Sequence, residues 1–280
     1  MIILQIVALF CYLGCIGAAV ISPSTEKARG QVSLAGKVLT WAGLLLHLAA
    51  FIGAWIHSSN FPVIGFKAVC SFIALAIIIY HVVFTQRYKS RLLTIFLMTA
   101  ASLLLMVSLH LPAPENPIPA SLAEAFQNDL VTRVLLPIHV MLLLFSYAAF
   151  LVTVGCGVMY LLQERLLKAR KFGKMFQWLP ALNTCDEVSY VSITFGFVGL
   201  SLGMITGMYW GNRHDGRFWH NDPKEVLTLV TWVCYLAMVH YRITAGWRGR
   251  RVAWLSIGGF LAVLVTFVGA RAMGGYHIFG

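Results

Sequence analysis

Long apolar runs separated by short polar segments recur along the whole chain of 280 residues. A hydrocarbon core about 30 Å thick requires about 20 apolar residues in a helix that crosses it. The runs are too long and too uniformly apolar to be barrel strands, which alternate. The pattern predicts an all-α integral membrane protein, a bundle of about eight transmembrane helices at residues 2–21, 33–57, 62–84, 92–110, 135–162, 188–209, 226–241 and 252–272.

The segment between the fourth and fifth predicted spans, residues 111–134, contains four prolines that end the preceding helix. Ser121 and Glu124 then have the spacing of a capping box. An apolar residue recurs at every fourth position, at Leu122, Phe126 and Leu130. We expect a short helix that lies in the membrane interface and presents one apolar face.

Composition supports the membrane assignment, and the placement of charge adds a topology. The chain is 59% hydrophobic and 11% charged, whereas a soluble domain carries roughly 25% charged residues. The net charge of +11 is explained by position, because cytoplasmic loops are rich in Lys and Arg. We therefore expect both termini outside and no nucleic-acid partner. Four alternate loops hold 15 of the 21 Lys and Arg: Lys27, Arg29, Lys37; Arg87, Lys89, Arg91; Arg165, Lys168, Arg170, Lys171, Lys174; Arg242, Arg248, Arg250, Arg251.

The expected location is the inner (plasma) membrane, as a multi-pass protein in contact with lipid, or the thylakoid membrane if the source is a plastid. The N-terminus lacks a basic segment before its apolar run, so we do not expect a cleaved signal peptide. None of the six cysteines falls in a predicted external loop, which argues against a structural disulfide. The chain also lacks the C-x-x-C-H sequence of a c-type cytochrome.

All ten carboxylates can be placed outside the apolar runs, whereas several histidines lie within or at the ends of spans. Ion and proton pumps usually need ionisable groups inside the membrane, so this distribution favours metal or haem ligation. The sixth span has a stripe of small residues at Gly199, Gly203 and Gly207. We interpret the stripe as a surface for close helix packing rather than as a ligand site.

The most informative segment is residues 207–225, GMYWGNRHDGRFWHNDPKE, predicted on the outer side between the sixth and seventh spans. It places Trp210, Phe218 and Trp219 beside several cations and carboxylates. An interfacial anchor needs only the aromatic rings. A flat apolar ligand with charged edges would use both kinds of residue, the rings against its face and Arg or Lys against its carboxylates.

Histidines supply the ligands for a metal. His139 lies near the outer end of the fifth predicted span and His277 lies beyond the outer end of the eighth. Both are expected at the level of the aromatic segment, and haem iron accepts one or two axial imidazoles. His240 falls near the inner end of the seventh span, where a polar group is a functional candidate by default, and His81 reaches a similar depth on the third.

Together these stretches resemble the tryptophan-rich "WWD" haem-handling superfamily, and most closely the CcsA (ResC) subunits of the system II cytochrome c synthase. The resemblance covers residues 135–280, and the first 134 show only the general pattern of apolar spans. We therefore expect one membrane domain, 1–280, whose haem-handling part is 135–280. The matching stretches are LLPIHVMLLLFSYAAF, LPALNTCDEVSYVSITFGFVGLSLGMITGMYW, DPKEVLTLVTWVCYLAMVHYR and GWRGRRVAW.

The resemblance implies roles for individual residues. His139 and His277 match the two external axial ligands of haem iron, and His240 matches the intramembrane histidine proposed to help haem cross. It implies haem b as the transported ligand, a CcsB (ResB) membrane subunit as partner, and attachment of the haem to the C-x-x-C-H motif of apocytochrome c by a haem lyase complex. Seven residues fall on the signature: Trp210, Gly211, Trp219, Asp222, Pro223, Lys224 and Glu225.

The sequence departs from the family pattern at three places. Asn221 replaces the second tryptophan of the signature, the stretch 212–217 is extra, and the C-terminal motif reads Gly-Tyr-His277-Ile. These departures leave open a HemX-like haem-binding relative without synthase activity. A b-type cytochrome fits less well, because His47 and His57 are only ten residues apart. A transporter or scaffold without haem is the third alternative.

Overall fold

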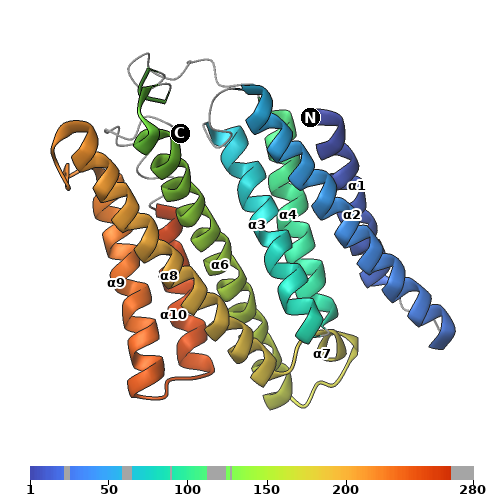
Figure 1. Ribbon diagram of the computed structural model, residues 1–280. Coiled ribbons are helices and arrows are strands. Elements are labelled where there is room, and N and C mark those ends of the chain that lie inside the picture. The colour runs from blue at the N-terminus through green and yellow to red at the C-terminus, as the bar shows by residue number, and fades with distance from the viewer. Residues whose placement is uncertain (22–25, 59–64, 89, 112–123, 127, 266–280) are drawn as a thin grey trace.

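The structure is a computed structural model that describes residues 1–21, 26–58, 65–88, 90–111, 124–126 and 128–265 (Figure 1). It is all-helical, and no strand occurs in these ranges. The helices are α1 (Ile2–Val20), α2 (Glu26–Ser58), α3 (Phe66–Arg87), α4 (Arg91–His110), α6 (Leu130–Lys168), α7 (Lys174–Trp178), α8 (Leu182–Asp215), α9 (Pro223–Thr244) and α10 (Arg250–Leu264).

Within the described ranges, seven helices are long and apolar enough to cross a membrane: α1, α2, α3, α4, α6, α8 and α9. They correspond in order to the first seven predicted spans. The eighth predicted span, 252–272, begins in α10, and its residues after 265 lie outside the described part of the chain. The predicted class, an all-α integral membrane protein, is confirmed. Its treatment as one domain stays a prediction.

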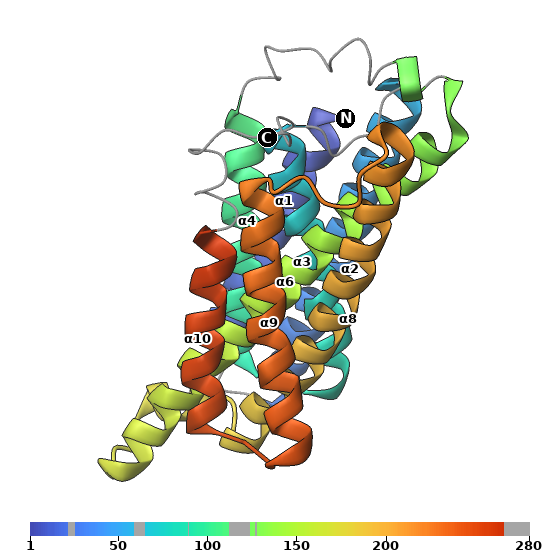
Figure 2. The same cartoon turned by 90° about the vertical axis from the view of Figure 1, so that its left-hand side faces the viewer.

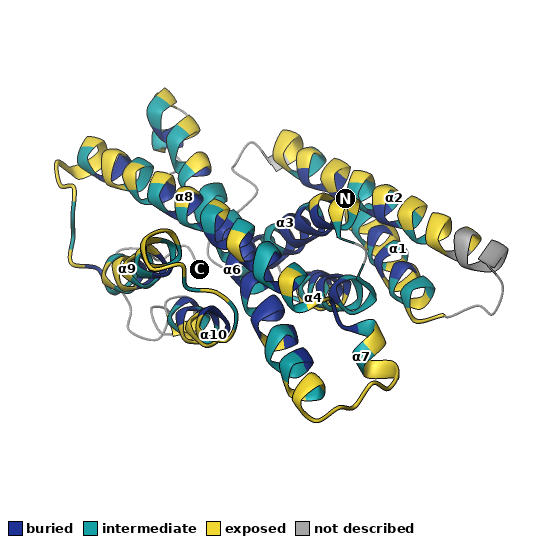
Figure 3. Cartoon of the chain, turned by 90° about the horizontal axis from the view of Figure 1, so that it is seen from below, coloured by how far each residue is buried: buried dark blue, intermediate teal, exposed yellow. Residues whose placement is uncertain are grey.

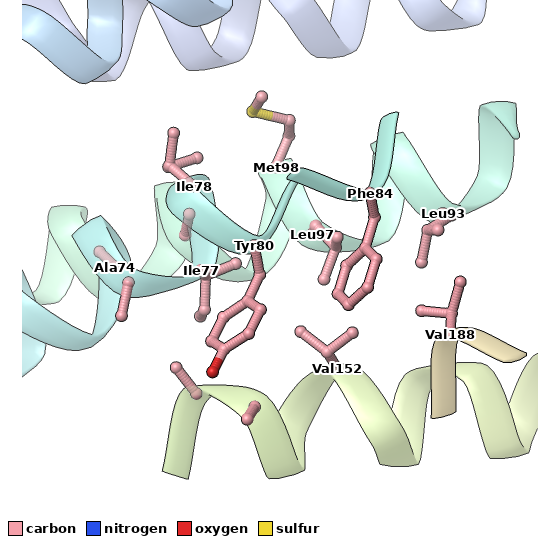
Figure 4. Close-up of a cluster of buried hydrophobic side chains, with 14 of the residues drawn as sticks. Ala74, Ile77, Ile78, Tyr80, Phe84, Leu93, Leu97, Met98, Val152 and Val188 are labelled. Carbon is pink, nitrogen blue, oxygen red and sulfur yellow. The ribbon is translucent and has the colours of Figure 1, made fainter. Parts of the chain in front are cut away.

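Helix α6 lies at the centre of the bundle. Seen along the helices, α1–α4 lie on one side of it and α8–α10 on the other (Figure 3). The largest apolar cluster joins α3 and α4 to α6, and it includes Tyr80, Phe84, Leu97 and Val152 (Figure 4). A second cluster packs Phe150 of α6 against helices α8, α9 and α10. The outward faces carry many exposed large apolar side chains, as expected of helices in lipid.

Successive helices run in alternating directions, so that the connections collect at two ends of the bundle (Figures 1 and 2). The connections α3–α4, α6–α8 and α9–α10, which are rich in Lys and Arg, all lie at the lower end in Figure 1. The start of α6, the end of α8 and the start of α9 lie at the upper end. The predicted topology requires the basic loops to lie on one side of the membrane, and these three connections do lie at one end of the bundle. That the lower end faces the cytoplasm stays a prediction.

The glycine stripe of α8 packs against α6, as predicted. A Cβ on Gly199 would meet the Ser146 hydroxyl, and a Cβ on Gly203 would meet the side chain of Leu143. A Cβ on Gly207 would overlap the ring of His139. These side chains of α6 occupy the space that the glycines leave, so the two helices approach closely along this line.

Two boundaries differ from the sequence-based prediction. Residues 207–215 are not a loop: α8 continues through Asp215 and ends at Gly216, whose φ of 77° is the left-handed conformation of a helix C-cap. Gly211 and Asn212 are residue types that can end a helix in this way, but both remain helical here, and the first left-handed residue of the stretch is Gly216. At 34 residues, α8 is about 50 Å long and exceeds the hydrocarbon core.

The second difference concerns the predicted interfacial helix. Leu130 opens α6, with Asp129 as its N-cap, and its side chain is exposed. Phe126 is buried instead, in an apolar cluster with side chains of α2, α3, α6 and α8. The prediction that these two side chains share one apolar face is therefore wrong. Ser121 and Leu122 lie outside the described residues.

Candidate functional site

His139 is held against the glycine stripe of α8. Its Nδ1 lies 2.7 Å from the carbonyl oxygen of Gly203. A carbonyl only accepts hydrogen bonds, so Nδ1 must carry the proton and donate. In the neutral ring the lone pair then sits on Nε2, which is the nitrogen that can bind a metal. The surroundings of this half-buried residue fit an axial ligand of haem iron.

Trp210 lies one turn beyond Gly207 on α8, and it is 6% exposed. Its indole N–H donates to Thr132 Oγ1 at 3.1 Å, and that hydroxyl donates to Asp129 Oδ2 at 2.7 Å. The hydroxyl and backbone N–H of Thr132 keep the pKa of Asp129 below its ordinary value. His214 stacks on the Trp210 ring at 5.1 Å. Trp210 therefore fastens the upper end of α8 to the start of α6.

The start of α9 is fixed by two acidic residues, Asp222 and Glu225. Asp222 is its N-cap and accepts from the backbone N–H of Lys224 at 2.8 Å. Glu225 accepts from the backbone N–H of Asp222 at 3.4 Å, which completes a capping box. Pro223 occupies the first helical turn, where its missing N–H costs nothing. The role of the D-P-K-E sequence that the structure shows is therefore to start α9.

Trp219 and Asn221 form a contact within the connection from α8 to α9. The indole N–H of Trp219 donates to Asn221 Oδ1 at 2.7 Å. Asn221 has a φ of 56°, a left-handed conformation that Asn tolerates better than most residues. Asn221 therefore shapes the turn and orients the Trp219 ring. Trp219 is half-buried and Phe218 is 55% exposed.

His220 lies between two carboxylates. Its Nε2 is 2.6 Å from Asp215 Oδ2, and its Nδ1 is 3.0 Å from Glu225 Oε1. Partial burial lowers the pKa of His220, but the hydrogen bonds to Glu225 and Asp215 outweigh burial and raise the pKa above its ordinary value. Gly211 admits this ring, because a Cβ there would lie 3.1 Å from His220 Cε1 and 3.3 Å from the Arg217 carbonyl oxygen.

His240 lies near the opposite end of α9, seventeen residues after Pro223, or about 26 Å along the helix. Its side chain is exposed on the outer face of the bundle and its ring contacts Tyr241 edge-on at 5.6 Å. His81 on α3 is buried, and its Nε2 is 3.3 Å from Thr94 Oγ1. The two helices lie on opposite sides of α6 (Figure 3), so His81 does not face His240.

Beside His240, Arg242 joins three segments. It makes two hydrogen bonds to Asp186, at 2.8 and 2.6 Å, and one to the Trp247 carbonyl oxygen at 3.1 Å. Asp186 also accepts from the backbone N–H of Gly249 at 2.8 Å. Both side chains are nearly buried. This ion pair ties the start of α8 to the end of α9 and to the α9–α10 connection.

His47 shows what a structural histidine looks like in this chain. It is fully buried, with Nδ1 3.2 Å from the Tyr12 hydroxyl and Nε2 2.9 Å from Ser71 Oγ. Both ring nitrogens are engaged in a hydrogen-bonded network between α1, α2 and α3. This arrangement does not support the b-type cytochrome alternative, which needs a free nitrogen on His47.

Comparison with known proteins decides the family. The sequence model of the family described as "Cytochrome C assembly protein" matches residues 63–277, which is more than half of the chain. The chain belongs to the cytochrome c assembly family. Family membership extends into the N-terminal half, where the sequence resemblance was only general.

The sequence is also similar over most of its length to individual proteins of cytochrome c biogenesis. The chain is 29% identical over 264 residues to "Cytochrome c biogenesis protein CcsA" of Prochlorococcus marinus strain MIT 9312, covering 87% of this chain and 84% of that protein. It is 29% identical to the CcsA of Microcystis aeruginosa, covering 84% of each chain. The predicted CcsA resemblance is confirmed.

The fold matches a solved structure, "Cytochrome c Heme Lyase CcmF", with a TM-score of 0.59 at 15% identity. The match covers 96% of this chain and 50% of the other, so the chain spans half the length of that protein. At this identity the match supports the membrane fold alone. The chain is thus a multi-pass membrane protein of cytochrome c biogenesis.

The structure brings together most of the predicted site residues. His139, Trp210, Gly211, Trp219, Asp222, Pro223, Lys224 and Glu225 all lie at the upper end of α6, α8 and α9. His277 lies outside the described residues, so its pairing with His139 stays a prediction. Sequence reasoning missed Asp129, Thr132 and Asp215 as supports of this end. The helix-capping pattern Asp129-x-x-Thr132 was the one available signal for the first two.

Proposed function

We propose that this chain carries haem b across the membrane and presents it at the outer surface for covalent attachment to the C-x-x-C-H motif of apocytochrome c. The observation that carries the proposal is the hydrogen bond from His139 Nδ1 to the Gly203 carbonyl. It fixes the tautomer of the neutral ring, with the proton on Nδ1 and the lone pair on Nε2, the nitrogen that would bind iron. His277 is the proposed second axial ligand, so that haem would sit at the upper end of α6 and α8.

The upper end of α6, α8 and α9 suits a flat substrate with an acidic edge. Trp219 and Phe218 supply aromatic surface in the connection that follows α8, and Trp210 fixes this end of α8 from within. Haem propionates would pair with cations of the same region. These are Arg213 and Arg217, which are exposed, and Lys224, which is half-buried.

His240 is proposed to assist haem on its way across. It lies on an exposed stripe of α9 with Leu229, Val233 and Leu236, which are apolar. A histidine on a face otherwise made for lipid is best explained by a partner that covers it. We propose that a CcsB (ResB) type membrane subunit supplies this cover and the second imidazole. His81 is a poor internal alternative, because it is buried on the other side of α6.

The proposal is tested by co-expressing the chain with a CcsB-type partner and a reporter apocytochrome c. We expect covalent haem on the reporter when all three are present, and none when either membrane protein is omitted. A reporter whose two motif cysteines are alanine serves as the control. Haem that copurifies with this chain while the reporter stays apo would favour the HemX-like alternative. A chain that binds no haem under any condition would overturn the proposal.

A variant separates the crossing step from the outer site. We expect His240→Ala to lower haem occupancy at the outer site while the protein remains folded in detergent. If this variant contains as much haem as the wild-type protein, His240 has no role in the crossing step.

A further inference from the structure

The three residues Asp215, His220 and Glu225 form a clasp between the end of α8 and the start of α9. Asp215 is the last residue of α8, and Glu225 lies in the first turn of α9. The His220 ring bridges them, at 2.6 Å from Asp215 Oδ2 and 3.0 Å from Glu225 Oε1. The three side chains are 29%, 11% and 17% exposed, so the bridge is largely shielded from water.

The geometry defines the charge of the clasp. Carboxylates only accept hydrogen bonds, so a ring that bonds one carboxylate through each nitrogen carries a proton on both. His220 is therefore an imidazolium between two anions. Glu225 contributes twice, because its Oε2 also accepts from the backbone N–H of His220 at 2.8 Å. Hydrogen bonds to charged groups are the stronger ones in proteins.

The clasp sits in the middle of the turn that carries the exposed aromatic residues. His220 lies directly between Trp219 and Asn221, which hydrogen-bond to each other at 2.7 Å. Residues 216–222 run between the two helix ends that the clasp joins. Gly211 leaves room for the His220 ring against α8. Fixing the ring therefore fixes the backbone on which Trp219 stands.

We propose that His220 is a positioning residue that closes the connection between α8 and α9 and holds Trp219 in place for haem, without ligating the iron. The haem part of this inference rests on the proposed function. The clasp itself does not, because it is a property of the protein alone. His220 differs in this respect from His139, whose Nδ1 hydrogen-bonds to a neutral carbonyl oxygen rather than to a carboxylate.

The experiment compares four variants in detergent and with haem. His220→Gln removes the charge but keeps a polar side chain, and Asp215→Asn weakens the other half of the bridge. His139→Gly is the ligand comparison. His110→Ala is the matched control, because His110 is an exposed histidine at the end of α4, at the same end of the bundle, and its Nδ1 hydrogen-bonds within its own helix, to the Met106 carbonyl oxygen at 2.8 Å.

Two measurements are made on each variant. Amide hydrogen exchange of residues 212–225 without haem reports on the clasp. Haem content and the reduced absorption spectrum, with and without added imidazole, report on ligation. We expect His220→Gln and Asp215→Asn to accelerate exchange in this segment by about tenfold or more, and His139→Gly and His110→Ala to leave it unchanged. In His220→Gln, haem content should fall, the remaining haem should stay low-spin, and imidazole should restore nothing.

The outcomes are separable. Unchanged exchange in both His220→Gln and Asp215→Asn would overturn the clasp. Rescue of His220→Gln by imidazole, with a high-spin spectrum before the addition, would make His220 a ligand and overturn its positioning role. If the wild-type protein binds no haem at all, the proposed function fails, whereas the exchange result still decides whether the clasp exists.

Discussion

The imidazole of His139 on α6 occupies the space that Gly207 leaves open on α8. A Cβ on Gly207 would lie 2.5 Å from His139 Nδ1, closer than real side chains allow. One turn earlier on α8, Gly203 accepts the hydrogen bond of the same nitrogen at 2.7 Å. Two members of the glycine stripe therefore set the place and the tautomer of one histidine.

The first prediction follows from this fit. Gly207→Ala should displace the His139 ring and break its bond to Gly203, so the proposed haem site should lose most of its occupancy. Haem content per protein after purification is the measurement. Gly258→Ala on α10 is the control, because a Cβ there meets nothing within 4 Å. Equal haem content in the two variants would show that His139 does not need this space.

The second prediction concerns the two proposed axial ligands. His139→Gly and His277→Gly should each lose haem, and each should recover it with added imidazole, because the free molecule replaces the missing ligand without the chain. His214→Gly should behave differently, since His214 stacks on the buried Trp210 ring. The reduced spectrum with and without imidazole makes the comparison. A His214 variant that responds to imidazole, beside a His139 variant that does not, would reverse the assignment.

Much of the fold could be predicted because lipid imposes a simple rule on length and apolarity, and seven spans obey it within the described residues. The end of α8 could not, because residues 208–215 mix aromatic, polar and charged side chains that suit either a helix or a loop. The burial of Trp210 depends on Thr132, which is 78 positions away in sequence. His139 was found by its place near the end of a span, whereas its tautomer depends on α8.

The third prediction is a pH dependence of the clasp. The carboxylates of Glu225 and Asp215 raise the folded pKa of His220 above that of the unfolded chain. The stabilisation is therefore fully present below about pH 6.5, the ordinary value for His, and is lost as pH rises through the raised folded pKa. Amide exchange of residues 216–222, corrected for its intrinsic dependence on pH, should accelerate at alkaline pH in the wild-type protein and not in His220→Gln.

Other charged groups face this region and must be separated from His220. Carboxylates, Lys and Arg ordinarily titrate well outside the neutral range, so within residues 212–225 His214 is the competing group. His214→Gln should keep the pH dependence of the wild-type protein. If His214→Gln loses it instead, the response does not belong to the clasp. The charged neighbours are Arg213, His214 and Asp215 on α8, Arg217 in the connection, and Asp222, Lys224 and Glu225 at the start of α9.

The fourth prediction concerns topology. Reporter fusions after Lys174, which opens α7, and after Arg251, in the first turn of α10, should read as cytoplasmic, because both positions adjoin the basic connections at the lower end in Figure 1. A fusion at the C-terminus should read as external. A cytoplasmic C-terminus would place His277 on the wrong side of the membrane and remove it from the proposed site.

The last prediction concerns the ion pair beside His240. Arg242 and Asp186 are 12% and 10% exposed, and their oxygen–nitrogen distance is 2.6 Å. Removing one partner of such a shielded pair leaves the other charge unpaired, which costs about 3–5 kcal/mol. Arg242→Gln should therefore lower the thermal unfolding midpoint in detergent. Asp186→Asn should do the same, and the double variant should lose less than the sum, because the two residues act as one unit.

Arg250 provides the matched control for this experiment. It lies 4.0 Å from Glu164 and is 62% exposed, and exposed pairs of this kind contribute about 0–1 kcal/mol. Arg250→Gln should leave the unfolding midpoint nearly unchanged while removing the same positive charge from the same end of the bundle. Since Arg242 lies two residues after His240, its loss should also reduce haem at the outer site if the end of α9 must be held in place. Additive effects in the double variant, or equal effects of Arg242→Gln and Arg250→Gln, would show that net charge and not the ion pair stabilises this end.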